Sequence, residues 1–291
     1  MYKIGYVILH YISEKDTKEC VDSILKYTYH QECYIVIVDN CSPNNSGERL
    51  AEQYKENSKI KTIINKKNIG FSKGNNVGIK YARDKLKCDF VVVLNNDTYL
   101  MNDEFEKILL SEYKYSGFAV LGPKIYDPSG LNSSNPGNVE LPSLQECDEG
   151  IYIWIQKLIK ALVVKWKSEK PVFNGDKNTE KICNKNIIDN RREFCRLHGC
   201  CLVLSPNYFE YFDGFVERTF MYAEETILLI NLRKKGLKSV YNPQLAIFHK
   251  EAVVSQKLFN GNMNYKKCWL MLKASIALKK EMREYLRSKN D

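Results

Sequence analysis

The sequence predicts an α/β fold built on a mainly parallel sheet flanked by helices. Short apolar runs rich in β-branched residues alternate with segments of helical spacing over residues 4–94. Repeated βα units of this kind build parallel sheets with right-handed crossovers. The run Phe90–Leu94 is apolar throughout, as expected of a strand that is covered on both faces. A chain of 291 residues is long enough for one large domain of this class with additions.

The predicted elements follow one another along the chain. Strands are expected at Ile4–Leu9, Tyr34–Val38, Lys61–Ile64 and Phe90–Leu94, with helices at Thr17–Tyr27, Ser46–Glu56 and Lys73–Asp84 between them. Residues 127–150 are rich in Pro, Gly, Ser and Asn and are expected to form a loop. A helix should follow, and then a polar exposed stretch at 174–190. The second half should hold a strand in the run CRLHGCCLVLS, a helix at Glu224–Lys235, short strands at Ser239–Tyr241 and Ala246–Phe248, and helix in the last 40 residues.

The positive charge of the chain lies in two segments outside this predicted core. The net charge is +9, and residues 151–170 carry five lysines against one glutamate. Residues 252–291 carry nine Lys or Arg against three acidic residues. We therefore predict a main domain at 1–250, which includes an insertion at about 127–193, and a basic helical extension at 251–291.

Three further properties limit the class of protein. No run of 18 apolar residues occurs, and the start lacks the layout of a signal peptide, so we expect a cytoplasmic location. The ten cysteines have no framework spacing and are expected to be reduced and mostly buried. A zinc site at Cys195, His198, Cys200 and Cys201 is the weaker alternative, because no C-x-x-C pair is present. No nucleic-acid motif accompanies the basic charge, so no nucleic-acid partner is expected.

Residues 151–166 have the pattern of an amphipathic helix that lies at a membrane surface. Apolar residues recur at spacings of three and four, with Lys157, Lys160 and Lys167 opposite. An anionic membrane would attract such segments by about 1 kcal/mol per Lys or Arg near its surface. Packing on the core or on a second subunit is the alternative, which leaves a homo-oligomer open. The apolar residues are Ile151, Trp154, Ile155, Leu158, Ile159, Leu162, Val163 and Trp166.

Polar residues follow the ends of the predicted strands, where ligands bind in open α/β sheets. Asn95, Asn96 and Asp97 offer hard oxygen ligands to a divalent cation that takes its other ligands from phosphates and water. An Asn-Asp turn is the alternative interpretation of this segment.

The two earlier strands also end on candidate ligand-binding residues. The first ends at His10 and Tyr11, and the second at Asp39 and Asn40. A carboxylate such as Asp39 can accept the ring N–H of a pyrimidine, and an aromatic ring such as Tyr11 can stack on a base. Residues 68–78, NIGFSKGNNVG, form a Gly/Asn-rich segment at a helix start that suits a diphosphate through its backbone N–H groups and Lys73. Neither a Walker loop nor the dinucleotide fingerprint is present.

The order of these motifs resembles the family 2 glycosyltransferases of the GT-A fold, especially the rhamnosyltransferase-like branch that builds bacterial capsule, O-antigen or cell-wall polysaccharides. The resemblance covers about residues 3–125 and 194–250. It implies that VDNCSPN binds the nucleotide base, that NIGFSKGNN lies along the donor, and that LNNDT holds Mg²⁺ or Mn²⁺. The donor-binding residues are then expected to be His10, Tyr11, Asp39, Asn40, Asn68, Gly70, Lys73, Asn76, Asn95 and Asn96.

Residues 215–225, FVERTFMYAEE, are similar to the family's stretch ending in Glu-Asp, whose last carboxylate is the general base. The resemblance gives this role to Glu225, with Glu224 before it. Two departures are present, because the usual Asp is Glu at 225 and the acidic residue common two positions later is Ile227. Without the resemblance, two carboxylates at a helix start would be ordinary dipole-stabilising residues.

Two histidines complete the candidate site. His198 and Gly199 match the strand beside the acceptor pocket, where glycine lets a substrate approach the backbone. His249 follows a predicted strand, as in family members whose late histidine reaches the metal or the diphosphate. The implied metal ligands are Asp97, Asn95 and His249.

The resemblance implies an inverting, metal-dependent transfer of rhamnose or another hexose from a UDP- or dTDP-sugar to a glycan or a lipid-linked acceptor. A sugar-nucleotide-binding partner subunit without catalysis is one rival hypothesis, supported by Ile227 alone. A nucleotidyltransferase is the other, but the Gly-rich basic loop that such enzymes carry after the first strand is missing.

Overall fold

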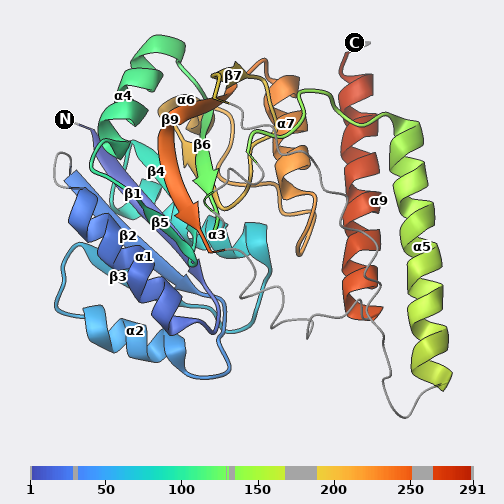
Figure 1. Ribbon diagram of the computed structural model, residues 1–291, viewed down its shortest axis with the longest axis horizontal. Coiled ribbons are helices and arrows are strands. Elements are labelled where there is room, and N and C mark those ends of the chain that lie inside the picture. The colour runs from blue at the N-terminus through green and yellow to red at the C-terminus, as the bar shows by residue number, and fades with distance from the viewer. Residues whose placement is uncertain are drawn as a thin grey trace.

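The computed structural model describes residues 2–28, 32–128, 130, 135–167, 189–250 and 265–289, without the side chains of 164–167. Within these residues a mixed sheet of nine strands lies between layers of helices (Figure 1). The strand order is β3-β2-β1-β4-β8-β6-β9-β5, with β7 beside β9. The strands are β1 Lys3–His10, β2 Glu32–Asp39, β3 Ile60–Ile64, β4 Phe90–Asn95, β5 Thr98–Leu100, β6 Val120–Tyr126, β7 Arg192–Glu193, β8 Cys201–Leu204 and β9 Ser239–His249.

The predicted α/β class is confirmed, and strands β1 to β4 are parallel to one another. β8 is antiparallel to both β4 and β6, whereas β6 and β9 are parallel. The helices are α1 Glu14–Tyr27, α2 Ser46–Tyr54, α3 Phe71–Lys80, α4 Phe105–Ser116, α5 Leu144–Lys167, α6 Pro206–Phe209, α7 Glu224–Lys234 and α9 Tyr265–Arg287, and a π-helical turn η1 at Tyr81–Lys85 continues α3.

Alternating side chains of the strands build one core on each face of the sheet. Tyr6 and Ile8 of β1 pack in the cluster that includes residues of α1, α2 and α4. Val7, between them, packs in the other cluster with residues of α3, α6 and α7. Both faces of the parallel strands are therefore covered, which explains why their sequences are apolar without alternation.

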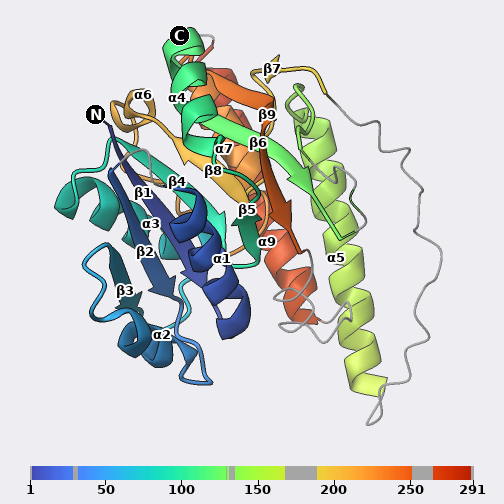
Figure 2. The same ribbon diagram turned by 60° about the vertical axis from the view of Figure 1, so that its left-hand side comes forward.

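Helices α5 and α9 lie side by side at the edge of the molecule, beyond α7 (Figures 1 and 2). A small core joins them, in which Cys147 of α5, Ile230 of α7 and Met282 of α9 are buried together. None of the described helices has the length and apolar character needed to cross a bilayer. Of the nine described cysteines, all except the exposed Cys41 are buried, as expected.

Three predicted segments differ from the observed elements by more than a few residues at a helix end. The loop expected at 127–150 ends earlier because α5 begins at Leu144, where Ser143 and Glu146 form a reciprocal capping box: Ser143 Oγ accepts the Glu146 N–H at 3.1 Å, and Glu146 accepts the Ser143 N–H at 2.7 Å. The two short strands at 239–241 and 246–248 are one strand, β9, whose register against β6 shifts around Pro243. In CRLHGCCLVLS only Cys201–Leu204 is strand.

Other elements were absent from the prediction or lie beyond the described residues. Strands β5 and β6 and helix α4 were not predicted. The polar stretch at 174–190 lies outside the described residues up to 188. The helix expected near the C-terminus is confirmed as α9, and residues 251–264 are not described.

Candidate functional site

A cavity of about 450 Å³ opens at the carboxyl edge of the parallel strands. The register of the sheet creates this edge, since His10 pairs with Asp39 and Leu9 with Asn95. The residues that follow β1, β2 and β4 therefore lie side by side. Because β8 runs antiparallel to β4, the residues before its start reach the same edge, and the Asn95 N–H donates to the Cys200 carbonyl at 2.9 Å.

The cavity brings together twelve of the sixteen residues that the sequence singled out. They are Tyr11, Asn40, Asn68, Gly70, Asn95, Asn96, Asp97, His198, Gly199, Glu224, Glu225 and His249. His10, Asp39, Lys73 and Asn76 do not line it. Leu9, Phe71, Cys200, Met221, Tyr222, Ala223 and Met271 line it without having been predicted.

Asn40 ties the segment after β3 to the end of β2. Its Nδ2 donates to Asn68 Oδ1 at 3.0 Å and to the Gly70 carbonyl at 3.1 Å, while its Oδ1 accepts the Ile69 N–H at 3.1 Å. Gly70 has a φ of +86°, and a Cβ there would lie 2.3 Å from the Phe220 carbonyl oxygen. Only glycine fits this backbone at such a close approach.

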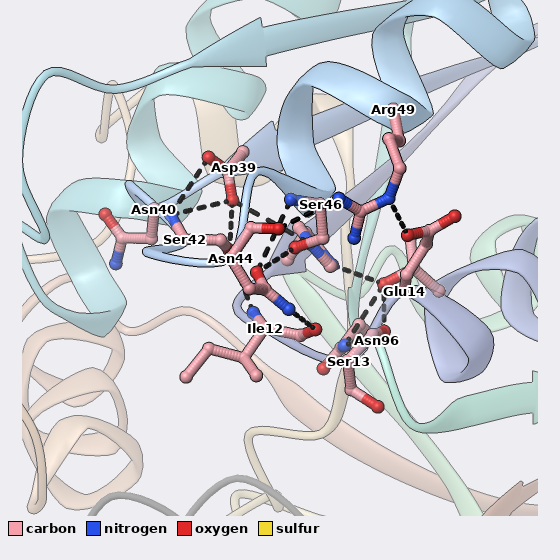
Figure 3. Close-up of polar contacts among 12 residues, drawn as sticks. Ile12, Ser13, Glu14, Asp39, Asn40, Ser42, Asn44, Ser46, Arg49 and Asn96 are labelled. Carbon is pink, nitrogen blue, oxygen red and sulfur yellow. Dashed lines mark hydrogen bonds and ion pairs between the residues drawn. The ribbon is translucent and has the colours of Figure 1, made fainter.

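Asp39 lies beneath the cavity in a buried polar network (Figure 3). Its carboxylate accepts the N–H of Ser42 at 3.1 Å and the hydroxyl of Ser42 at 2.5 Å. His10 lies 2.6 Å from the Thr17 hydroxyl and 2.7 Å from the Ser46 hydroxyl, and burial lowers its pKa. These side chains fix the loop after β2, next to the cavity-lining residue Asn40.

Asp97 and His249 meet across two strands that are distant in sequence. β5 and β9 pair antiparallel with Thr98 opposite His249, which sets His249 Nε2 3.2 Å from Asp97 Oδ1. Both side chains are buried, and His249 Nδ1 has no hydrogen-bond partner among the described residues. Such an orphaned atom is uncommon in a folded protein and is typical of functional sites.

These two residues fit part of the coordination sphere of a divalent cation. Octahedral Mg²⁺ holds its ligands at about 2.1 Å, so neighbouring ligand atoms lie about 3 Å apart, close to the spacing of Asp97 and His249. Asn95 lines the cavity beside them. No group of three or more His, Cys, Asp or Glu side chains suited to a metal occurs in the described ranges, so any further ligands would come from asparagine, water or substrate.

Asn96 and His198 hold neighbouring segments. Asn96 Nδ2 donates to Thr17 Oγ1 at 3.1 Å and to the Ser13 carbonyl at 3.3 Å, which ties the end of β4 to the start of α1. The ring of His198 packs against that of His249, with 5.8 Å between the centroids, and its Nδ1 accepts the Cys200 N–H at 3.1 Å.

Two carboxylate residues at the start of α7, Glu224 and Glu225, also line the cavity. Glu225 Oε1 accepts the Gly199 N–H at 3.2 Å, and a Cβ at Gly199 would meet the same oxygen at 3.2 Å. Glu224 accepts the Thr219 hydroxyl at 3.2 Å, and burial raises its pKa to about 7. Ile227 is buried and lines a separate small cavity, so the departure at that position leaves the lining of the main cavity unchanged.

The backbone before α7 is strained. Tyr222 and Ala223 both have positive φ, at +79° and +66°, although neither is glycine. Such conformations cost of order 1–3 kcal/mol each and cluster at functional sites. No sequence pattern predicts them. Met271 was missed because it comes from α9, in the segment that was predicted as a separate extension.

Asn76 and Lys73 lie outside the cavity. Asn76 Nδ2 donates to the Phe215 carbonyl at 2.8 Å and to Glu217 Oε1 at 2.9 Å, and its Oδ1 accepts the Phe215 N–H at 2.7 Å. Asn76 thus fixes the segment that leads to α7. Lys73 lines a second, smaller cavity next to the first.

Solved structures define the class of this fold. The chain superimposes on Staphylococcus aureus TarS 1–349 in complex with UDP with a TM-score of 0.54 at 18% identity, over 86% of this chain and 61% of that one. It superimposes on GalNAc-T7 with UDP, GalNAc and Mn²⁺ with a TM-score of 0.58 at 14% identity, over 87% of this chain and 44% of that one. The fold is the GT-A fold of nucleotide-diphospho-sugar transferases.

Sequence comparisons give the family. Residues 6–150 match the model of glycosyl transferase family 2. The chain is 26% identical over 234 residues to the low-salt glycan biosynthesis hexosyltransferase Agl10 of Haloferax volcanii, over 80% of this chain and 62% of the relative. It is 24% identical over 225 residues to the N-acetylglucosaminyl-diphospho-decaprenol L-rhamnosyltransferase of Mycobacterium tuberculosis, over 75% of this chain and 66% of the relative. The chain belongs to glycosyl transferase family 2, within its rhamnosyltransferase-like branch, and spans less than two thirds of the length of these relatives.

Proposed function

We propose that this protein is an inverting, metal-dependent glycosyltransferase that moves rhamnose or another hexose from a UDP- or dTDP-sugar to a glycan or a lipid-linked acceptor. One observation carries the proposal: Glu225, at the start of α7, lines the same cavity as Asp97 and His249. An inverting transfer needs a base on one side of the sugar and a place for the leaving diphosphate on the other. The activity named for both curated relatives agrees with this assignment.

The donor would bind along the carboxyl edge of β1, β2 and β4. Tyr11 is available to stack on the base, and Asn40 and Asn68 form the wall beside Gly70. The buried network of His10 and Asp39 would keep this wall in one shape, which lowers the entropy lost on binding. TarS and GalNAc-T7, which share this fold, are complexed with UDP in their solved structures, which supports a uridine or thymidine nucleotide here.

Asp97 and His249, with Asn95 beside them, would hold a divalent cation such as Mg²⁺ or Mn²⁺. When bound, the cation would supply a positive charge that stabilises the developing charge on the leaving nucleoside diphosphate.

Glu225 would act as the general base. As the acceptor oxygen attacks C1 of the donor sugar, the bond from C1 to the diphosphate oxygen breaks and the acceptor proton passes to Glu225. The Gly199 N–H holds the carboxylate in place. Glu224 would position the α7 start through Thr219, because its raised pKa keeps much of it protonated at neutral pH.

We further propose that the protein works at the inner face of the cytoplasmic membrane, in the synthesis of a surface polysaccharide. Six apolar side chains of α5 are exposed, with Lys157 and Lys160 on the same helix. The exposed apolar residues are Tyr152, Ile153, Ile155, Ile159, Leu162 and Val163. Trp166 was predicted to lie on the apolar face of this helix, and its side chain is outside the described residues.

Thermal stabilisation by nucleoside diphosphates tests the donor assignment. UDP, dTDP, GDP, CDP and ADP are compared with and without Mg²⁺ or Mn²⁺, and a ligand at 100 times its dissociation constant should add about 2.7 kcal/mol of stability. A metal-dependent shift with UDP or dTDP supports the proposal. No shift with any of them would contradict it, and release of pyrophosphate from a nucleoside triphosphate would favour a nucleotidyltransferase.

A further inference from the structure

A second cavity of about 210 Å³ lies beside the main one, between the start of α3 and the middle of α9. Its apolar lining includes Ile69, Phe220 and Leu270, and its charged lining includes Lys73 and Lys273. We call this cavity the lysine groove. Since the predicted donor residue Lys73 faces it and not the main cavity, Lys73 needs a different partner from the one that the sequence implied.

The wall between the two cavities is thin. Thr219 lines the lysine groove, and its hydroxyl donates to Glu224, which lines the main cavity. On α9 the consecutive residues Leu270 and Met271 line the groove and the main cavity respectively. The two cavities therefore adjoin at Thr219–Glu224 and at Leu270–Met271, so a molecule that extends from Glu225 across these residues would place its next group in the lysine groove.

The charges of the groove are unevenly compensated. Arg218 pairs with Glu281 at 2.8 Å and with Glu284 at 2.9 Å. Glu217 already accepts a hydrogen bond from Asn76. Lys73 and Lys273, in contrast, have no ion pair within the part of the chain that the structure describes, and both are exposed.

The second lysine is also held in position. Lys273 Nζ lies 5.0 Å from the centre of the Trp269 ring one turn earlier on α9, so its stem lies along the helix. On the other side, the Phe71 N–H donates to the Phe220 carbonyl at 2.8 Å, which fixes the start of α3 and hence Lys73 against the groove wall. Two lysine side chains thus border the apolar residues of the groove. This arrangement suits a ligand in which a phosphate is joined to a hydrocarbon chain.

We propose that the lysine groove binds the phosphate or diphosphate that links the acceptor sugar to its lipid, through Lys73 and Lys273. This inference rests on the proposed function and deepens it, because it makes the reacting sugar the one attached directly to the phosphate. Ile69, Phe220 and Leu270 would contact the first carbons of the lipid. Exposed apolar residues occur on α9, which borders the groove, and on α5, which packs on α9, and the rest of the lipid would continue over them.

Farnesyl diphosphate is a soluble probe for this site. Its binding is measured with the protein saturated by the nucleoside diphosphate that stabilises it best, so that the donor position is filled. Farnesol serves as the probe without phosphate. The variants are Lys73→Gln, Lys273→Gln and the double variant, with Lys80→Gln on α3 and Lys266→Gln on α9 as matched exposed controls.

The wild-type protein should bind farnesyl diphosphate at least about tenfold more tightly than farnesol, a difference of about 1.4 kcal/mol. The double variant should lose that preference and keep its affinity for the nucleoside diphosphate, and the two controls should match the wild type. An unchanged preference in the double variant would overturn the inference. So would an equal loss of nucleoside diphosphate affinity, which would return Lys73 to the donor site.

The headgroups of anionic membrane lipids also carry a phosphate joined to hydrocarbon. A vesicle experiment distinguishes binding to a membrane from binding of a single lipid-linked acceptor. If the double variant binds phosphatidylglycerol vesicles more weakly but keeps its preference for farnesyl diphosphate, the lysines face the membrane and the inference is wrong. Failure of the proposed function would be recognised separately, because the wild-type protein would then bind no nucleoside diphosphate.

Discussion

The two walls of the main cavity are held in different ways. On the wall formed by the ends of β1, β2 and β4, Asn40 and Asn96 each make several hydrogen bonds to neighbouring segments, and Asp39 is bound twice by Ser42. On the wall before α7, Glu225 makes one hydrogen bond to the described residues, and the backbone passes through two residues with positive φ. The first wall is suited to fixed recognition of a donor, and the second to chemistry that moves a proton.

The sharpest test of this difference is to neutralise the carboxylate of the second wall. Glu225→Gln should lower the rate of sugar transfer by about 10²–10⁴-fold, because it removes the proton acceptor and keeps the shape. Affinity for the nucleoside diphosphate should stay at the wild-type value. Glu48→Gln, which makes the same change at an exposed glutamate in the first turn of α2, serves as the control. A variant that keeps its rate would show that Glu225 is not the base, whereas a wild-type protein without measurable transfer would support the non-catalytic partner subunit.

The contact between the walls can be broken at Gly70. Gly70→Ala should reduce the free energy of unfolding by about 1–3 kcal/mol more than Gly130→Ala, measured by urea denaturation. Both glycines have positive φ, at +86° and +79°, but a Cβ at Gly70 meets the Phe220 backbone, whereas one at Gly130 meets no atom of the described residues within 4 Å. If the two variants lost equal free energies of unfolding, residues 220–223 would adjust freely. The close contact between Gly70 and Phe220 would then not hold the second wall in place.

The pH dependence of stability separates the two carboxylates of the second wall. Glu224 has a folded-state pKa of about 7, above the ordinary 4.5, so the folded protein holds that proton more tightly than the unfolded chain. Stability is therefore lost as the pH rises from 4.5 through 7. Glu224→Gln should remove this loss, so the variant should gain stability over wild type at pH 8 relative to pH 4.5. If the free energies of unfolding of the two proteins changed equally with pH across this range, the raised pKa of Glu224 would be contradicted.

The last effect is expected from one hydroxyl group of the first wall, which makes two hydrogen bonds. Ser42→Ala removes the hydroxyl that donates to Asp39 and accepts the Ile12 N–H, and should cost about 1–3 kcal/mol of stability and weaken nucleotide binding. Ser288→Ala, whose hydroxyl bonds only the Tyr285 carbonyl near the end of α9, is the control. Weaker binding at unchanged stability would mean that Ser42 touches the nucleotide itself.

The same contrast explains what could be predicted from the sequence. The residues of the first wall could be predicted from the ends of the strands. The parallel register alone brings Tyr11, Asn40 and Asn95 to one edge of the sheet. The second wall depends on tertiary packing. Met271 reaches the cavity because α9 packs on α7. His249 lies beside Asp97 because β9 pairs with β5, a strand that was not predicted.

Asn76 and Lys73 show the limit of a motif. Both belong to the segment NIGFSKGNN, but α3 turns them away from the cavity that Gly70 and Phe71 line. Side-chain direction on a helix depends on where the helix begins, and the predicted start was two residues late.

The central claim is that one cavity holds a donor-side group at Asp97 and His249 and a base at Glu225. Titration calorimetry of the best-binding nucleoside diphosphate, with Mg²⁺ or Mn²⁺ present, tests it in the wild type, Asp97→Asn and Glu225→Gln. We predict that Asp97→Asn weakens binding at least about tenfold, or about 1.4 kcal/mol, and that Glu225→Gln binds as the wild type does. Wild-type affinity in Asp97→Asn would contradict the claim.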